Sequence, residues 1–137
     1  MSNEPTNFKT IYGVGATIYN MPLYQRSYCW TEKELSLFKE DLTQLLKSHI
    51  RGSDKKIYLG AVILMKKETK GVTSAKEFFV IDGQQRFTTV YLAILALAEY
   101  FKKHHIKNNL KDFFVSSAKG SENCPKLNVT SLDTKQF

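Results

Sequence analysis

The chain has 137 residues and a mass of 15.7 kDa, which is enough for one domain with a single hydrophobic core. Its composition, 42% hydrophobic and 24% charged, is typical of globular proteins, and no run approaches the roughly 18 consecutive apolar residues that a membrane span needs. The net charge of +7 favours an anionic partner, but the lysines are scattered, so nucleic-acid binding and an ordinary solvated surface both remain open.

The start of the chain lacks the basic and then apolar pattern of a secretion signal, which predicts a cytoplasmic protein. We expect residues 1–14 to be a flexible N-terminus and residues 15–137 to form the domain. Cys29 and Cys124 are expected to be reduced thiols, because neither they nor the three histidines have the spacing of a zinc site.

In chain order, the first expected element is a short strand at residues 16–20, after which Pro22 interrupts regular pairing and leads into a polar and aromatic loop. Thr31 and Glu34 have the spacing of a capping box, which predicts a helix that begins after Thr31 and ends near Gly52. The apolar residues of this helix fall on one stripe, formed by Leu35, Phe38, Leu42, Leu45 and Leu46.

Residues 57–65 are continuously apolar apart from Gly60. This pattern predicts a central strand that is buried on both faces, with Gly60 at a close backbone approach. We expect residues 77–81 to pair with it in a hairpin, which would bring Asp82 to the end of the sheet.

Apolar residues surround most of the segment from Gln84 to about Lys103, which predicts a core helix. A short helix at residues 109–116 and a strand at residues 127–129 are expected to follow. The chain then stops within what would be the first turn of another helix, so we expect a C-terminally truncated fragment.

The most informative segment is residues 78–89, in which a strand, an Asp-Gly turn and a helix start follow one another. Backbone N–H groups at a helix start lack intrahelical partners, so Gly83, Gln84 and Gln85 offer donors to an anion, and Arg86 adds a guanidinium fork. This arrangement suits phosphate. The alternative is ordinary turn chemistry, in which Asp82 caps the helix and Arg86 forms a surface ion pair.

A second Gln-Arg pair, Gln25-Arg26, supports the phosphate site. Only three of the twenty basic residues are arginine, and two of them lie in these pairs. Guanidinium binds phosphate bidentately and stacks on aromatic rings, so we expect both segments to converge on one concave, positive site. The alternative is that Tyr24, Tyr28 and Trp30 form a packing cluster over the first long helix.

Four ordered segments resemble a known family. They are PLYQRSYCW at residues 22–30, the leucine-patterned helix, YLGAVIL at 58–64 and IDGQQRFTT at 81–89. Together they resemble the DUF262 family, the N-terminal domain of GmrSD-type, modification-dependent restriction proteins. Phe87 stands where the family usually has leucine, a difference that keeps an apolar contact.

The resemblance implies a mixed α/β domain of the ParB/sulfiredoxin-like type, with a small sheet flanked by helices. It also implies hydrolysis of a nucleoside triphosphate in the intact protein, coupled to restriction of modified foreign DNA. In this hypothesis Arg86 and the backbone of residues 83–85 hold the phosphates, assisted by Gln25 and Arg26. Asp82 polarises water or holds a divalent cation, expected to be Mg²⁺, and Gln84 or Gln85 orients the nucleophile.

Two other hypotheses compete with this one. In the first, the chain is a non-catalytic DNA-binding module in which Tyr24, Gln25 and Arg86 sense a modified phosphate or base. In the second it is a structural scaffold, which leaves both Gln-Arg pairs without a purpose.

DNA cleavage is not expected of this chain. Members of the resembled family continue into helical regions and often an HNH-type nuclease domain. This sequence contains neither a His-Asn-His cluster nor a paired-carboxylate metal motif. We therefore expect cleavage to belong to a missing C-terminal effector domain, which would be a partner of this one.

Overall fold

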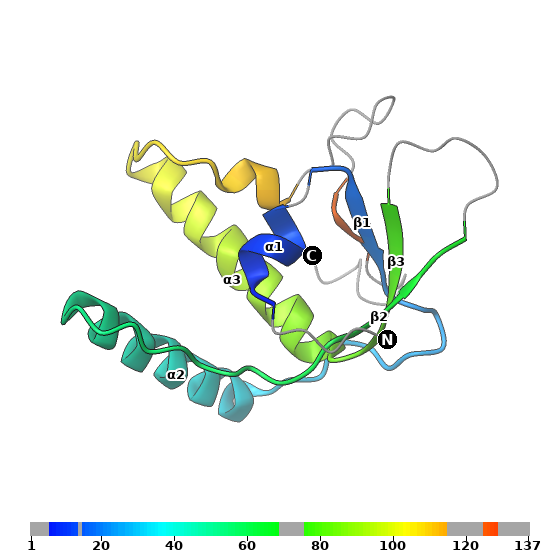
Figure 1. Cartoon of the computed structure of the whole chain (residues 1–137), viewed down its shortest axis with the longest axis horizontal. Coiled ribbons are helices and arrows are strands. Elements are labelled where there is room, and N and C mark those ends of the chain that lie inside the picture. The colour runs from blue at the N-terminus through cyan, green and yellow to red at the C-terminus, as the bar shows by residue number, and fades with distance from the viewer. Residues whose placement is uncertain (1–5, 14, 69–75, 115–124, 129–137) are drawn as a thin grey trace.

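The computed structural model describes residues 6–13, 15–68, 76–114 and 125–128 (Figure 1). The helices are α1 (Phe8–Gly13), α2 (Glu32–Ile50) and α3 (Gln84–Lys103), with a short 3-10 helix, η1 (Leu110–Phe113). The strands are β1 (Thr17–Asn20), β2 (Ile63–Lys66), β3 (Lys76–Asp82) and β4 (Leu127–Asn128). The α/β fold class is thus confirmed.

The four strands form one mixed sheet in the order β2-β3-β1-β4. β1 runs parallel to both of its neighbours, with Tyr19 opposite Phe78 of β3 and Leu127 of β4. β2 runs antiparallel to β3. Because β1, β3 and β4 point the same way, their carboxyl ends share one edge of the sheet, which is where α/β proteins bind ligands.

One hydrophobic core joins the sheet to α1 and α3, which lie together in Figure 1. Phe87 of α3 is at its centre, with its ring centroid 4.7 Å from that of Tyr12 and 4.9 Å from that of Tyr19. The buried apolar side chains are those of Tyr12, Tyr19, Val80, Phe87, Val90 and Leu127. This core fixes the first turns of α3 against the sheet.

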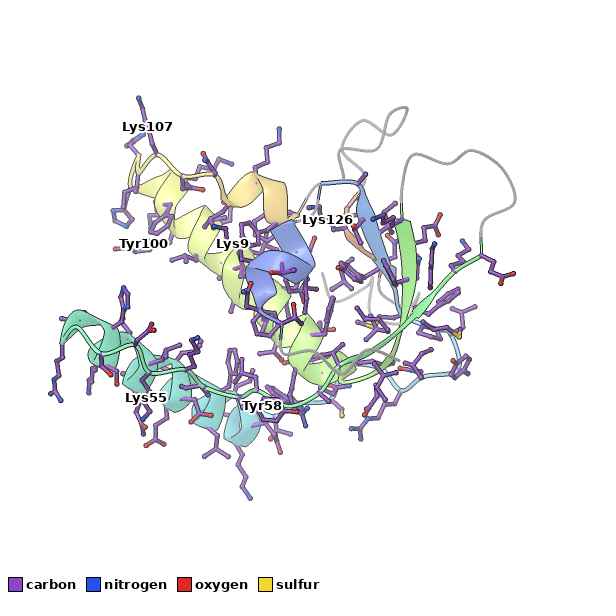
Figure 2. All side chains as sticks on the ribbon, in the orientation of Figure 1. Lys9, Lys55, Tyr58, Tyr100, Lys107 and Lys126 are labelled. Carbon is purple, nitrogen blue, oxygen red and sulfur yellow. The ribbon has the colours of Figure 1, made fainter. Side chains whose placement is uncertain are left out.

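The helix α1 is not predicted by the sequence, because it falls within the segment expected to be flexible. Tyr12 is nevertheless fully buried, and its hydroxyl donates to the carbonyl oxygen of Phe87 at 2.6 Å. Lys126, also buried, donates from Nζ to the carbonyl oxygen of Tyr12 at 2.7 Å and lies beside α1 in Figure 2. Burial raises the pKa of the Tyr12 hydroxyl far above its usual value, which keeps it a donor. Residues 8–13 are therefore part of the folded domain.

The prediction of a central strand at residues 57–65 is wrong. β2 covers only Ile63–Lys66 and lies at the edge of the sheet, with Met65 52% exposed. The apolar residues before it do not enter the sheet. Val62 lies beside the start of α3, since a Cβ atom on Gly83 would lie 3.1 Å from its Cγ2, whereas Tyr58 is 83% exposed. The antiparallel pairing with β3 is confirmed, with a register shift between Ile63 and Leu64.

The helix α2 has the predicted capping box, in which the Thr31 N–H donates to Oε2 of Glu34 at 2.8 Å. None of its residues is buried, and it diverges from α3 in Figure 1. Its apolar stripe is only partly covered, since Leu46 is 59% exposed while Phe38 packs against the Trp30 ring.

The remaining predicted elements are also present. β1, η1 and β4 match the expected strand, short helix and final strand, and α3 has the predicted bounds. Ser116 and Val129, at the ends of two expected elements, and Cys124 lie outside the described residues. Within the described residues, no helix is long and apolar enough to cross a membrane.

Candidate functional site

A cavity of about 290 Å³ lies at the carboxyl edge of the sheet, where β3 leads into α3. It is lined by residues 81–86 and, from the loop after β1, by Gln25, Arg26 and Trp30. The two Gln-Arg pairs therefore share one cavity, as predicted. Among the described residues, the lining has two guanidinium groups and the carboxylate of Asp82, so its formal charge is positive.

A sharp turn at Gly83 opens the cavity beside the start of α3. Gly83 has a φ of +80°, and a Cβ atom there would lie 2.7 Å from the carbonyl oxygen of Ala61. Its N–H donates to Oδ1 of Asp82 at 2.7 Å. The first intrahelical bond runs from the Phe87 N–H to the Gly83 carbonyl, which leaves the N–H groups of residues 84–86 at the positive end of the helix dipole.

The guanidinium of Arg86 rests on the segment before β2. Nη1 lies 3.5 Å from the carbonyl oxygen of Ala61, and a Cβ atom on Gly60 would lie 2.2 Å from Nη1. Gly60 therefore marks a close backbone approach, as predicted, and the group it approaches is the Arg86 side chain. Arg86 is held at the cavity although its side chain is exposed.

The loop after β1 is fastened to the sheet and to α3 by side-chain amides. Gln25 Nε2 donates to the Ile81 carbonyl at 2.8 Å. Gln85, which is buried, accepts the Cys29 N–H on Oε1 at 2.9 Å and donates from Nε2 to the Ser27 carbonyl at 3.2 Å. Both ends of the Gln85 amide are thus engaged, and Gln25 and Arg26 are held at the cavity.

In the part of the chain that the structure describes, two other predicted site residues, Gln84 and Tyr24, are not held by hydrogen bonds in the way that Gln25 and Gln85 are. Gln84 lines the cavity, and its Nε2 atom is buried with no hydrogen-bond partner among the described residues. An unpaired buried donor is costly. Tyr24 is 79% exposed and is not among the residues that line the cavity, so its assignment to DNA sensing stays a prediction.

Trp30 and Ile81 line the cavity although sequence reasoning did not assign them to the site. Trp30 lines the cavity, and its ring packs against Phe38, with centroids 6.2 Å apart. The alternative prediction, in which Trp30 packs over the first long helix, is therefore correct for its contact with Phe38. The signal available in the sequence was its place four positions after Arg26, in the same loop.

The carboxylate at the cavity would suit a metal ion that is coordinated partly by the bound ligand. Within the described residues no group of three or more His, Cys, Asp or Glu side chains gathers as a metal site. Asp82 is the one carboxylate of the lining. Mg²⁺ commonly binds through one or two carboxylates together with substrate phosphates and water, so Asp82 would hold it only alongside a phosphorylated ligand.

None of the lysines that the structure describes lines the cavity. Lys9, Lys55 and Lys107 lie on three separate parts of the chain in Figure 2. The cavity is therefore distinguished by its arginines rather than by the general surplus of lysine.

Comparison with known proteins places the chain in a family. No curated protein matches the sequence. The family model described as "GmrSD restriction endonuclease, N-terminal domain" matches residues 8–136 and so includes α1, both Gln-Arg pairs and β4. The chain belongs to the family of GmrSD restriction endonuclease N-terminal domains.

Proposed function

We propose that this domain binds and hydrolyses a nucleoside triphosphate within a modification-dependent restriction protein that defends against foreign DNA. The observation that carries the proposal is the meeting of Arg26, Arg86, Gln84 and the start of α3 in one cavity. Each of these groups donates hydrogen bonds, and phosphate oxygens accept them.

In this proposal the residues divide the work of phosphoryl transfer. Arg26, Arg86 and the backbone N–H groups of residues 84–86 hold the phosphates and stabilise the charge that develops on them. Gln84 orients the attacking water. Asp82 holds a divalent cation, which would neutralise phosphate charge when bound. Gln85 is a positioning residue, since both ends of its amide already hold the loop.

The test is replacement of Arg86. Arg86→Ala is expected to cost about 2 kcal/mol or more of transition-state stabilisation, or roughly 30-fold or more in hydrolysis rate, because a charge-stabilising donor is lost. Arg86→Lys should rescue poorly because an ammonium lacks the bidentate fork. The measurement is nucleoside triphosphate hydrolysis with and without magnesium, with a melting curve for each variant.

Arg51→Ala is the matched control, because Arg51 is the one arginine outside both pairs and lies exposed at the end of α2. It should leave hydrolysis unchanged. Equal activity of the two folded alanine variants would remove Arg86 from the proposed mechanism. A protein that binds no nucleoside triphosphate would contradict the whole proposal.

A second candidate function is sensing of modified DNA by Tyr24, Gln25 and Arg86. The observation that favours it is the 79% exposure of the Tyr24 side chain, directly beside a residue of the cavity lining. Binding of modified and plain duplexes should then differ at a fixed salt concentration. Equal affinities that fall together as salt rises would indicate only general attraction to the lysine-rich surface.

We further propose that DNA cleavage is performed by a separate effector domain.

A further inference from the structure

The described residues that line the cavity supply two kinds of chemistry. Arg26, Arg86 and the start of α3 contribute cationic groups and hydrogen-bond donors. Trp30 contributes an aromatic side chain and Ile81 an apolar one. A ligand that complements both kinds carries an anionic group and a flat ring.

Trp30 is held in place on two sides. The N–H of its neighbour Cys29 donates to Gln85 at 2.9 Å, which ties this part of the loop to α3. Its ring packs on Phe38 of α2 at an interplanar angle of 59°. Trp30 is nevertheless only half-buried and is among the residues that line the cavity. A supported ring of this kind offers a rigid stacking surface at little cost in side-chain entropy.

We infer that Trp30 stacks on the base of a nucleotide whose phosphates lie at Arg86 and the start of α3. The inference rests on the proposed function and adds the group by which the site distinguishes a nucleotide from an inorganic polyphosphate. Every base has a π face, so stacking accepts all of them. The site therefore binds nucleoside triphosphates of all four bases.

The test compares nucleoside triphosphates with inorganic tripolyphosphate, which lacks the base. Calorimetric affinities are measured for the wild-type chain, Trp30→Leu and Trp30→Phe. Trp30→Leu should lower nucleotide affinity by about tenfold, a typical loss for one base stacked on an aromatic side chain. Its affinity for tripolyphosphate should not change, and Trp30→Phe should keep most of the nucleotide affinity.

Fluorescence of the unmodified protein gives a second measurement that does not depend on folding of a variant. Trp30 is the only tryptophan of the chain. Nucleotides should change its emission, whereas tripolyphosphate should change it little. Phe38→Leu is the matched control for packing: it removes the supporting ring, which is not part of the lining, and should reduce nucleotide affinity less than Trp30→Leu does.

The outcomes separate the inference from the proposed function. Unchanged nucleotide affinity in Trp30→Leu, or an equal loss for tripolyphosphate, overturns the stacking role alone. Failure of the wild-type chain to bind either compound overturns both proposals. A short single-stranded oligonucleotide offers the same base and phosphate chemistry. If it displaces the nucleotide and depends on Trp30 to the same degree, the assignment to a free nucleotide is overturned.

Discussion

Gln84 and Gln85 are chemically identical neighbours, yet their side chains have different surroundings. The Gln85 amide forms a hydrogen bond at each end with the backbone of Ser27 and Cys29, whereas Gln84 Nε2 has no partner among the residues that the structure describes. Gln85→Ala should therefore loosen the loop and raise KM, because Arg26 is no longer held at the cavity. Gln84→Ala should chiefly lower kcat. Steady-state hydrolysis kinetics separate the two effects.

Coupling to Arg26 provides the control for Gln85. If Gln85 acts by placing Arg26, the rise in KM caused by Gln85→Ala should be much smaller in an Arg26→Ala background. Additive effects of the two substitutions would contradict the positioning role, and so would a fall in kcat as large as that of Gln84→Ala.

At the scale of elements, the segment before β2 acts as a support for Arg86. Gly60→Ala would place a methyl group 2.2 Å from Nη1 of Arg86, at a backbone φ of +95°. We expect this variant to displace the guanidinium and to weaken phosphate binding, with a stability loss of about 1 kcal/mol from the unfavourable φ. Affinity for a nucleoside triphosphate and the free energy of unfolding in urea are the measurements.

Gly52→Ala is a close control, because Gly52 has a φ of +76° and nothing within 4 Å of an added Cβ atom. It should show a similar loss of stability and no loss of affinity. If the two variants bind nucleotide equally well, the segment does not position Arg86.

Sequence patterns predicted the elements whose signals are local. The capping box at Thr31 acts over a few residues and is found as expected. The prediction of a core helix holds only for the first turns of α3, because its buried residues end at Val90 and Leu97 is 44% exposed. Burial of Tyr12 depends on its contacts with Phe87 and Lys126, and Lys126 is 114 positions away. The sequence of residues 1–14 alone therefore does not predict it. The prediction of a strand at residues 57–62 is wrong for a related reason. An apolar run does not indicate whether it forms a strand of the sheet or packs at the start of a helix.

The candidate site was more predictable than the fold around it. The Asp-Gly turn and the two Gln-Arg pairs carry their chemistry in their residue types, and they share one cavity. The contact of Trp30 with Phe38 depends on where α2 lies. The hydrogen bond from Cys29 to Gln85 depends on the path of a loop 56 positions earlier. Neither follows from local spacing.

At the scale of the whole molecule, we expect α1 to unfold together with the rest of the domain, so that the cooperative unit begins at residue 8. Tyr12→Phe removes the hydroxyl that donates to Phe87 at 2.6 Å, and should cost about 1 kcal/mol of unfolding free energy, measured by urea denaturation. KM should not change, because Tyr12 does not line the cavity. Tyr100→Phe, at a side chain 55% exposed, should leave stability unchanged. Equal midpoints for the two variants would place α1 outside the cooperative unit.

The pairing of β1 with β4 has a consequence for how the protein is made. Asn20 and Asn128 end neighbouring strands and are joined by a side-chain hydrogen bond, although they are 108 positions apart. A ribosome synthesises roughly 5–20 residues per second, so β1 waits several seconds for its partner strand. Leu127 belongs to the core, so the nascent chain cannot complete that core until β4 has left the exit tunnel. During that interval the apolar side of β1 is open to chaperones or to wrong partners, and a translational pause before residue 127 would lengthen the exposure.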